Sequence, residues 1–357
     1  METLTKRILP PQHRRFPPTD ESKLGFGDIF SDHLFKMDYH DGQWRNPRIE
    51  PYAPLQLDPA AMSLHYAQLV FEGLKCFRRQ DGQLGLFRPR DNFARLARSV
   101  RLLCMPDFDQ ELALTALREL LDIDRNWVPR SPGTALYIRP FIVATEPHLG
   151  VRPSNDYLFM IITGPVGAYY SAGFAPIDIY VEPQYSRVPP CGLGEAKAGA
   201  NYASSLYAAM EAHKKGYSQL LWLDPCEHKY VEEVGSMNMF FVIGDEIVTS
   251  PLAGTVLPGV TRDSVCVMAE DWGLKVAQRL LSIDEIIEAG ENGRLQEAFG
   301  AGTAAVISPV GRLHYKGRDI VVGDGGIGKI TRRLYDELTG IQYGSRPDAH
   351  HWIMPVK

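Results

Sequence analysis

The sequence predicts an α+β protein of two domains, in which mixed sheets are flanked by helices. The chain has 357 residues, roughly twice the 150 residues of a typical domain. Hydrophobic residues make up 45% of it and charged residues 23%, the balance of an ordinary folded protein. Strand-like segments occur in clusters separated by helical ones, without the regular alternation of a doubly wound sheet. These observations favour mixed sheets over a parallel α/β fold.

Helical periodicity is clearest in the first half of the chain. The string DNFARLARSVRLLCM, which begins at Asp91, spaces its apolar residues three or four positions apart, and a second such stretch covers about 110–127. The strings TALYIRPFIVAT and DYLFMIITGPV follow. Both are short, rich in β-branched and aromatic residues, and bounded by Gly, Pro or Asn. We therefore expect two helices and then two strands.

The second half mixes the two kinds of element. Strands are predicted for IDIYVE, SQLLWL, KYVEEV, NMFFVI and EIVTS. Helices are predicted over about 202–215 and from Thr261 to about Gly273. Ser282 and Glu285 form an S-x-x-E pattern that is typical of a capping box, so a third helix is expected to begin there.

A loop-like stretch, AYYSAGFAP, separates the two halves. We therefore expect a smaller N-terminal domain with an N-terminal arm over residues 1–170. An interdomain loop at 171–176 would lead to a larger C-terminal domain over 177–357.

Charge and cysteine content indicate which kinds of molecule the protein binds and in which compartment it works. Lysine and arginine number 38 against 43 acidic residues, and the formal net charge of -5 gives no general attraction to nucleic acid or to an anionic membrane. No apolar run reaches the roughly 18 residues that span a bilayer. The five cysteines are widely spaced, as in a reducing compartment. We expect a cytoplasmic protein whose partners are small molecules or other subunits.

The string GLGEAKAGANYASSL places Lys197 among small residues, five positions before Tyr202. Small neighbours would let a planar cofactor approach the amine, and a desolvated lysine has a lowered pKa and becomes a nucleophile. Lys197 is therefore a candidate Schiff-base residue. The plainer alternative is an exposed lysine that serves solubility.

The string YVEEVGSMNMFFV carries Glu232 and Glu233 in a predicted strand. Neighbouring residues of a strand face opposite sides, so only one of the two carboxylates can point into a given site. A buried carboxylate needs a cationic partner, and a protonated pyridine nitrogen is one. The alternative is a pair of surface acids on an edge strand.

Two glycine-containing turns and one arginine are candidates for binding phosphate. In LPGVTRDSV a Pro-Gly turn leads into a helix near Thr261, where backbone N–H groups and a hydroxyl favour an anion. In FGAGTAAVISPV a turn of small residues with Thr303 could form an anion-binding nest. Arg95 could add a positive charge. Helix capping, a tight turn and a solvated arginine are the plainer interpretations.

The order of these motifs resembles that of a known family. Along the chain run HYAQLVFEGLKCF, LFRPRDNFARLARS, LYIRPFIVATEPHLGV, GPVGAYY, EAKAGANYASSL, QLLWLD, VEEVGSMNMFF, LPGVTRDSV, FGAGTAAVISPV and IQYG. Together, from about Gly25 to Val356, they resemble the branched-chain amino acid aminotransferases, which are fold-type-IV (class IV) enzymes dependent on pyridoxal phosphate. The resemblance implies that family's two-domain fold, with the lysine in the larger C-terminal domain, and a homodimer.

The resemblance also implies an activity. Leucine, isoleucine or valine would exchange its amino group reversibly with 2-oxoglutarate, giving branched 2-oxo acids and L-glutamate by a ping-pong mechanism with pyridoxal 5′-phosphate. Lys197 would bind the cofactor and carry the proton, Glu233 would pair with the pyridine nitrogen, and Tyr202 would bind the ring oxygen. The residues expected to hold the phosphate are Arg95, the N–H groups of Val260 and Thr261, and Thr303.

A substrate pocket is implied in the same way. Its apolar wall would select branched side chains by burial. Arg139 would bind the side-chain carboxylate of glutamate, Val151 would come from the partner subunit, and N–H groups near Ser236 and Ala304 would bind the α-carboxylate. The residues that match the aromatic wall are Phe26, Tyr66, Phe71, Tyr137 and Tyr169. Plain core packing is the alternative for each of these rings.

Other functions stay open at this point. D-amino acid aminotransferases and aminodeoxychorismate lyases share the lysine, the glutamate and the phosphate turns, although the aromatic wall and YIRPFIVATEPHLGV favour the branched-chain enzyme. From another class, VVGDGGIGKI partly matches the phosphate loop of a nucleotide-binding protein, but Lys329 is followed by no Ser or Thr. No metal site is expected, because the adjacent His350 and His351 lack a nearby Cys or Glu pair.

Overall fold

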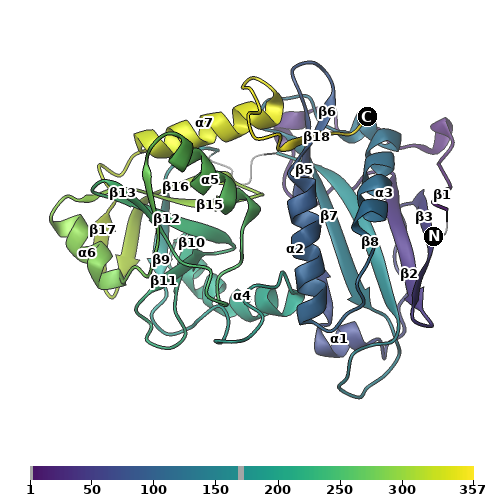
Figure 1. Cartoon of the computed structure of the whole chain (residues 1–357), viewed down its shortest axis with the longest axis horizontal. Coiled ribbons are helices and arrows are strands. Elements are labelled where there is room, and N and C mark those ends of the chain that lie inside the picture. The colour runs from purple at the N-terminus through teal and green to yellow at the C-terminus, as the bar shows by residue number, and fades with distance from the viewer. Residues whose placement is uncertain (1–2, 168–172) are drawn as a thin grey trace. The chain divides into compact units, whose positions relative to one another are not determined.

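The computed structural model describes residues 3–167 and 173–357 (Figure 1). The chain divides into two compact units. The first unit contains residues 3–167, Ala196–Ala200 and Gly340–Lys357, and the second contains residues 173–195 and Asn201–Thr339. Each has helices and a large mixed sheet, so the predicted α+β class is confirmed. The predicted domain boundaries stay a prediction, since part of 171–176 lies outside the described residues.

The first unit is built on a nine-stranded sheet in the order β1-β3-β2-β8-β7-β5-β6-β18, with β4 paired to β7. Among the described strand pairs of this sheet, only β1–β3 is parallel. The strands are β1 (Thr5–Lys6), β2 (His33–His40), β3 (Gln43–Pro51), β4 (Leu69–Phe71), β5 (Leu74–Arg78), β6 (Leu84–Phe87), β7 (Ala135–Ala144), β8 (Tyr157–Val166) and β18 (Ile353–Pro355). The strands predicted from TALYIRPFIVAT and DYLFMIITGPV are therefore confirmed as β7 and β8.

Two amphipathic helices, α2 (Pro89–Leu102) and α3 (Gln110–Ile123), cover one face of this sheet (Figure 1). Their apolar residues pack against the strands in one continuous core. Burial of this apolar face stabilises both helices far more than their intrinsic propensity does. Both elements were expected from the periodicity, and both are confirmed. A short helix, α1 (Met62–Tyr66), leads into β4.

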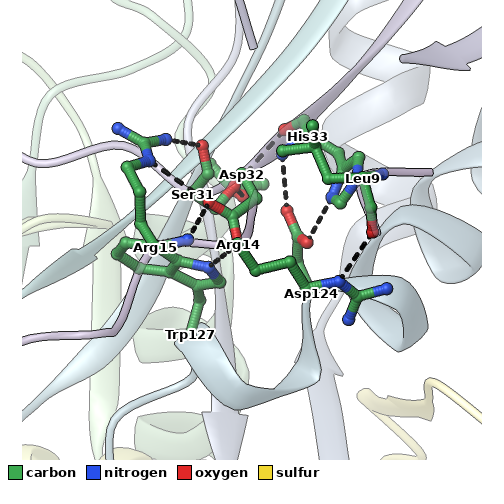
Figure 2. A network of polar contacts seen from close by, with 9 residues as sticks. Leu9, Arg14, Arg15, Ser31, Asp32, His33, Asp124 and Trp127 are labelled. Carbon is green, nitrogen blue, oxygen red and sulfur yellow. Dashed lines mark hydrogen bonds and ion pairs between the residues drawn. The ribbon is translucent and has the colours of Figure 1, made fainter. Parts of the chain in front are cut away.

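The N-terminal arm is fastened to the first unit by a buried polar network (Figure 2). The N–H of Leu9 donates to Nε2 of His33 (2.9 Å), and Nδ1 of the same ring lies 2.6 Å from Oδ1 of Asp124. Because a backbone N–H occupies Nε2, the ring carries its proton on Nδ1 and donates it to Asp124. Asp32 accepts from the N–H of Arg15 (3.1 Å). These contacts join arm residues that precede the loop carrying Phe26 to residues that directly follow it.

The second unit contains another nine-stranded sheet, in the order β11-β10-β9-β16-β15-β12-β13-β14. β11 also pairs with β12, so six of the strands close into a ring around an apolar core, and β17 pairs with β16. The strands are β9 (Ile177–Val181), β10 (Gln219–Leu223), β11 (Val231–Val234), β12 (Met237–Ile243), β13 (Glu246–Thr249), β14 (Lys275–Gln278), β15 (Leu295–Gly302), β16 (Val306–Tyr315) and β17 (Arg318–Val321). All five strands predicted in this half are confirmed.

Four helices accompany this sheet: α4 (Gly199–Lys214), α5 (Val260–Asp271), α6 (Ile283–Glu291) and α7 (Lys329–Tyr343). α4 begins three residues before the expected start at 202. Ser282 caps α6 by accepting from the N–H of Glu285 (3.1 Å), as predicted, but the Glu285 carboxylate pairs with Arg279 and completes no capping box. Among the described residues, none of the helices combines the length and apolar character needed to cross a membrane.

Candidate active site

In the first unit, Lys197 lies in a corner formed by β4 and α2. Its carbonyl oxygen accepts from the N–H of Phe71 (3.0 Å), and its N–H donates to Oγ of Ser99 (2.9 Å). Its ammonium lies over the Phe71 ring, 5.1 Å from the centroid. The flanking Ala196 and Ala198 are fully buried, which explains the small residues around the lysine. The backbone of Lys197 is therefore held from two sides, while its side chain extends across an aromatic ring.

Arg95 lies one helical turn before Ser99 and so on the same face of α2. Its Nε and Nη2 donate to Oε1 (2.7 Å) and Oε2 (2.9 Å) of Glu72. Both side chains are buried, with exposed fractions of 8% for Arg95 and 1% for Glu72. Burial raises the pKa of Glu72, but the charge and hydrogen bonds of Arg95 outweigh it and hold that pKa below its usual value. Arg95 is thus not the solvated residue of the plainer interpretation.

Four of the predicted substrate residues are neighbours in this unit. The Arg139 guanidinium lies 4.6 Å from the Phe71 ring centroid and 5.3 Å from that of Tyr137, and its Nη2 donates to the Tyr137 hydroxyl (3.1 Å). The Phe26 ring meets Tyr137 edge-on at 4.9 Å. A Cβ at position 73 would lie only 2.1 Å from the Tyr137 hydroxyl, so Gly73 makes room for it. A cation and three rings thus form one cluster.

The remaining predicted substrate residues of this half are placed differently. Tyr66 is partly exposed and donates its hydroxyl to the carbonyl of Leu149. Val151 has an exposed fraction of 85%. Tyr169 lies outside the described residues.

In the second unit, Glu233 lies on β11 with an exposed fraction of 2%. Its Oε1 accepts from the N–H of Leu257 (2.6 Å), and its Oε2 lies 3.4 Å from Nε of Arg187. Nδ2 of Asn238, on β12, donates to the carbonyl of Leu257 (2.9 Å). Both backbone groups of Leu257 are therefore fixed, three residues before α5 begins.

The neighbouring Glu232 is buried as well. Its Oε1 accepts from the Thr255 hydroxyl, and its Oε2 has no hydrogen-bond partner within the part of the chain that the structure describes. Burial therefore raises the pKa of Glu232. Since β11 pairs with both β10 and β12, the interpretation of two surface acids on an edge strand is wrong.

α5 begins directly after Gly259, at which no side chain caps the helix. A Cβ at this position would lie 2.0 Å from Oδ1 of Asn238, so glycine is required. The two predicted phosphate residues here, Val260 and Thr261, are buried in the first turn. Because Asn238 touches Gly259, the start of α5 lies beside the beginning of β12.

The predicted turn at Thr303 and Ala304 connects β15 to β16. β15 pairs with β12, and Ala301 lies opposite Asn238 in that pair. The turn therefore lies at the same end of β12 as the start of α5. Glu233, the first turn of α5 and the Thr303 turn thus all lie near the beginning of β12.

A cavity of about 230 Å³ in the second unit is lined by Tyr202, Glu233, Ser236 and Arg187, among others. A buried carboxylate and a phenol at one cavity suit a flat ring that carries both an N–H and an oxygen. Glu233, which lines this cavity, also binds the N–H of Leu257, three residues before α5 begins, and a helix start favours an anion. This donor set could hold a cofactor with a cationic ring and a phosphate.

A glutamate of the protein binds the helix start that follows the glycine loop at 323–329. Oε1 of Glu297 accepts from the N–H of Ile330 (2.9 Å), and Oε2 accepts from the N–H (2.8 Å) and hydroxyl (2.7 Å) of Thr331. A Cβ at Gly328 would lie 2.0 Å from Cδ of Glu297. The place at the start of α7 where a nucleotide phosphate would bind is occupied, so the nucleotide-binding alternative is wrong. Over residues 3–167 and 173–357, no three His, Cys, Asp or Glu side chains group to hold a metal ion.

Sequence reasoning missed four residues that hold this arrangement: Glu72, Ser99, Arg187 and Asn238. Two of them carried a signal, since Glu72 and Asn238 are polar residues inside otherwise apolar strings. Ser99 could have been found at one helical turn from Arg95. Arg187 lies in a loop without periodicity, and no local pattern indicates its pairing with Glu233.

This chain is similar to known proteins of one family. Residues 69–313 match the family model for amino-transferase class IV. The chain is 50% identical to branched-chain-amino-acid transaminase 1 of Bacillus subtilis (strain 168), over 94% of this chain and 95% of that protein. The structure is similar to the Escherichia coli branched-chain amino acid aminotransferase, with a TM-score of 0.76, 27% identity and coverage of 91% of this chain and 99% of the other. It is also similar to the branched-chain amino acid aminotransferase from Thermobaculum terrenum in its PLP form (holo form), with a TM-score of 0.74, 25% identity and coverage of 93% and 100%. The chain therefore belongs to the class IV aminotransferases and, among them, to the branched-chain-amino-acid aminotransferases.

Proposed function

We propose that this enzyme transfers the amino group of leucine, isoleucine or valine reversibly to 2-oxoglutarate, with pyridoxal 5′-phosphate (PLP) as cofactor. The products are branched 2-oxo acids and L-glutamate. The observation that carries the proposal is the cavity that Glu233, Tyr202 and Ser236 line in the second unit. The names of the relatives support the substrate class, and the neighbour from Thermobaculum terrenum, solved in its PLP form, supports the cofactor.

The ring of the cofactor fits the donors of this cavity. Bound pyridoxal phosphate supplies an electron sink for negative charge at the substrate α-carbon. Glu233 would keep a proton on the pyridine nitrogen, because a buried carboxylate favours a cationic partner. Tyr202 would donate its hydroxyl to the ring oxygen.

The phosphate group fits the start of α5. The N-cap residue of that helix is Gly259, which has no side chain to bind the N–H groups of the first turn, and a helix start favours an anion. Val260 and Thr261 would donate their N–H groups, and Thr303 its hydroxyl. Arg95 would add a charge-assisted bond.

Lys197 would hold the cofactor through its amine and, once released, would take the α-proton of the substrate and return it. Its N–H and carbonyl are both anchored, so only the side chain has to move between these tasks. The buried alanines on either side keep the backbone close to the neighbouring elements.

The aromatic cluster would bind the substrate side chain. The rings of Phe26, Phe71 and Tyr137 would favour branched aliphatic groups by burial, and Tyr66, Tyr169 and a partner's Val151 would extend this wall. Arg139 would bind the second carboxylate of glutamate, because its guanidinium already lies against two of the rings. N–H groups near Ser236 and Ala304 would bind the α-carboxylate.

We further propose that the enzyme is a cytoplasmic homodimer. The exposed apolar side chains of Val151 and Leu149 support a second copy that covers this loop. All five cysteines are free thiols, which supports a reducing compartment. The oligomeric state is measurable by light scattering of the purified enzyme.

The test is the visible absorption spectrum of the protein with pyridoxal phosphate, recorded alone, after L-leucine and after 2-oxoglutarate. We expect a yellow band that bleaches with leucine and returns with 2-oxoglutarate. Lys197→Ala is expected to show neither the protein-bound band nor turnover. A band that responds to D-alanine but not to leucine would contradict the substrate assignment, and a protein that never develops the band would contradict the cofactor.

A further inference from the structure

Glu72 lies in the turn between β4 and β5, where the proposed function gives it no role. Four N–H groups converge on its carboxylate: Nε and Nη2 of Arg95, Nδ2 of Asn92 (3.0 Å) and the N–H of Gly73 (3.1 Å). We propose that Glu72 is a positioning residue, which sets the Arg95 guanidinium for the cofactor phosphate without touching the cofactor. The inference rests on the proposed function, because it requires Arg95 to bind that phosphate.

The ion pair between Glu72 and Arg95 fixes the orientation of the Arg95 guanidinium. Glu72 binds the Nε edge of the guanidinium through two parallel hydrogen bonds of 2.7 and 2.9 Å. Two such bonds fix both the plane and the rotation of a guanidinium, which one bond does not. A free arginine side chain samples many rotamers, and an anion that binds it must order them. Arg95 is thus ordered before any phosphate arrives.

The backbone of Glu72 is itself held in place by the sheet. Its N–H donates to the carbonyl of Pro140 on β7 (2.7 Å), which fixes the residue to the sheet. The preceding residue, Phe71, donates its N–H to the carbonyl of Lys197. Two adjacent residues therefore position the proposed phosphate arginine and the proposed cofactor lysine. One short segment thus contacts both the Arg95 guanidinium and the backbone of Lys197.

The negative charge of Glu72 distinguishes two possible effects of this residue on phosphate affinity. If Glu72 acted on the phosphate only through its own charge, its removal would relieve a repulsion and strengthen phosphate binding. If it acts by ordering Arg95, its removal weakens phosphate binding. The two accounts differ in the sign of the effect.

The experiment compares two probes, pyridoxal 5′-phosphate and pyridoxal, which share the ring and the aldehyde but differ in the phosphate. Both are titrated by absorbance into the full-length apoprotein, as wild type and as Glu72→Gln. By analogy with residues that orient metal ligands, we expect a loss of about 10- to 100-fold in affinity for pyridoxal 5′-phosphate. The affinity for pyridoxal is expected to stay unchanged. Glu72→Asp keeps the charge and should recover part of the loss.

Glu297→Gln is the matched control, since it neutralises another buried glutamate, one that binds a helix start. It should leave both affinities unchanged. Equal losses for the two probes in Glu72→Gln would mean a merely structural role and would overturn the inference, as would a gain for pyridoxal 5′-phosphate. If Glu72→Gln does not fold, Glu72→Asp undergoes the same comparison, with a smaller loss expected for the phosphate probe alone. A wild-type protein that binds both probes equally would instead contradict the phosphate role of Arg95, and so the proposed function.

Discussion

Two helices of the second unit begin after glycine turns, and their first turns are used in opposite ways. At α7, the carboxylate of Glu297 accepts from the N–H groups of Ile330 and Thr331. At α5, Gly259 provides no side-chain cap. The sequences LPGVT and GIGKI show the same local pattern of glycine followed by helix. The difference lies in the cap: a distant carboxylate, that of Glu297, binds two N–H groups of α7, whereas the N-cap residue of α5 has no side chain that could do so.

A helix start carries a partial positive charge and several N–H groups without intrahelical partners. A carboxylate from the same chain that binds these N–H groups stabilises the folded protein. Where no such carboxylate binds them, the N–H groups can bind an anionic ligand. Near the start of α5, Glu233 binds the N–H of Leu257 and Glu232 binds the Thr255 hydroxyl, while Asp263 lies in the first turn of the helix itself. Glu232 and Glu233 thus hold the loop that leads into α5, and the phosphate that we propose would bind at the first turn of this helix.

The largest effect is expected from Gly259→Ala, which displaces the start of α5. The new Cβ would lie 2.0 Å from Oδ1 of Asn238, and this side chain also holds the carbonyl of Leu257. The start of α5 must shift, so we expect affinity for pyridoxal phosphate to fall about 100-fold, the loss that a misplacement of about 1 Å can cause. An absorbance titration of the apoprotein measures it.

Gly326→Ala is the matched control in the other glycine loop. Its Cβ would meet only the end of the exposed Asp324 side chain, at 2.9 Å, and that side chain can move. Cofactor affinity should stay within a factor of about two of wild type, by the small effect usual for surface substitutions. If the two variants bind the cofactor equally well, α5 does not hold the phosphate.

The two helix starts also show which features of the structure can be predicted from the sequence. Elements follow from local periodicity, so α2, α3 and the central strands β7, β8 and β12 were all predictable. The cap at Ser282 was predictable too, because its partner is three residues away. Local patterns also single out both glycine turns as possible anion sites.

The partner of each charged group is not local. Glu297 lies 33 residues before Ile330, and Glu72 lies 23 residues before Arg95. Sheet pairing and helix packing bring these residues together, and neither leaves a periodic signal in the sequence. For this reason the sequence identified α7 as a possible nucleotide site and Arg95 as a possible solvated residue, and the structure corrects both.

A smaller effect, on stability, is expected from Glu297→Ala. The substitution leaves three buried or half-buried donors of Ile330 and Thr331 without the carboxylate. The free energy of unfolding should fall by about 2 kcal/mol, within the range for an unsatisfied buried polar group. Urea unfolding measures this change. Cofactor affinity should stay unchanged, because α7 takes no part in the proposed site; a parallel loss of affinity would contradict the separation of the two helix starts.

The smallest effect is expected from Glu232→Gln, and it depends on pH. Burial raises the pKa of Glu232 in the folded protein, whereas the unfolded chain has the ordinary value. The contribution of this residue to stability is therefore complete below the unfolded pKa and is lost as the pH rises through the folded one. Glutamine resembles the protonated acid, keeps an acceptor for the Thr255 hydroxyl and carries no charge at any pH.

The variant and the wild type should therefore be equally stable at about pH 3.5, below the ordinary pKa of a glutamate, and should diverge towards about pH 8. The variant should become the more stable by on the order of 1 kcal/mol, the lower end of the cost of a buried polar atom without a partner. Urea unfolding at both pH values measures the difference. A variant that is less stable than wild type at the higher pH would mean that the ionised Glu232 stabilises the loop before α5. That loop would then depend on the charges of both Glu232 and Glu233, which bind Thr255 and Leu257 within it.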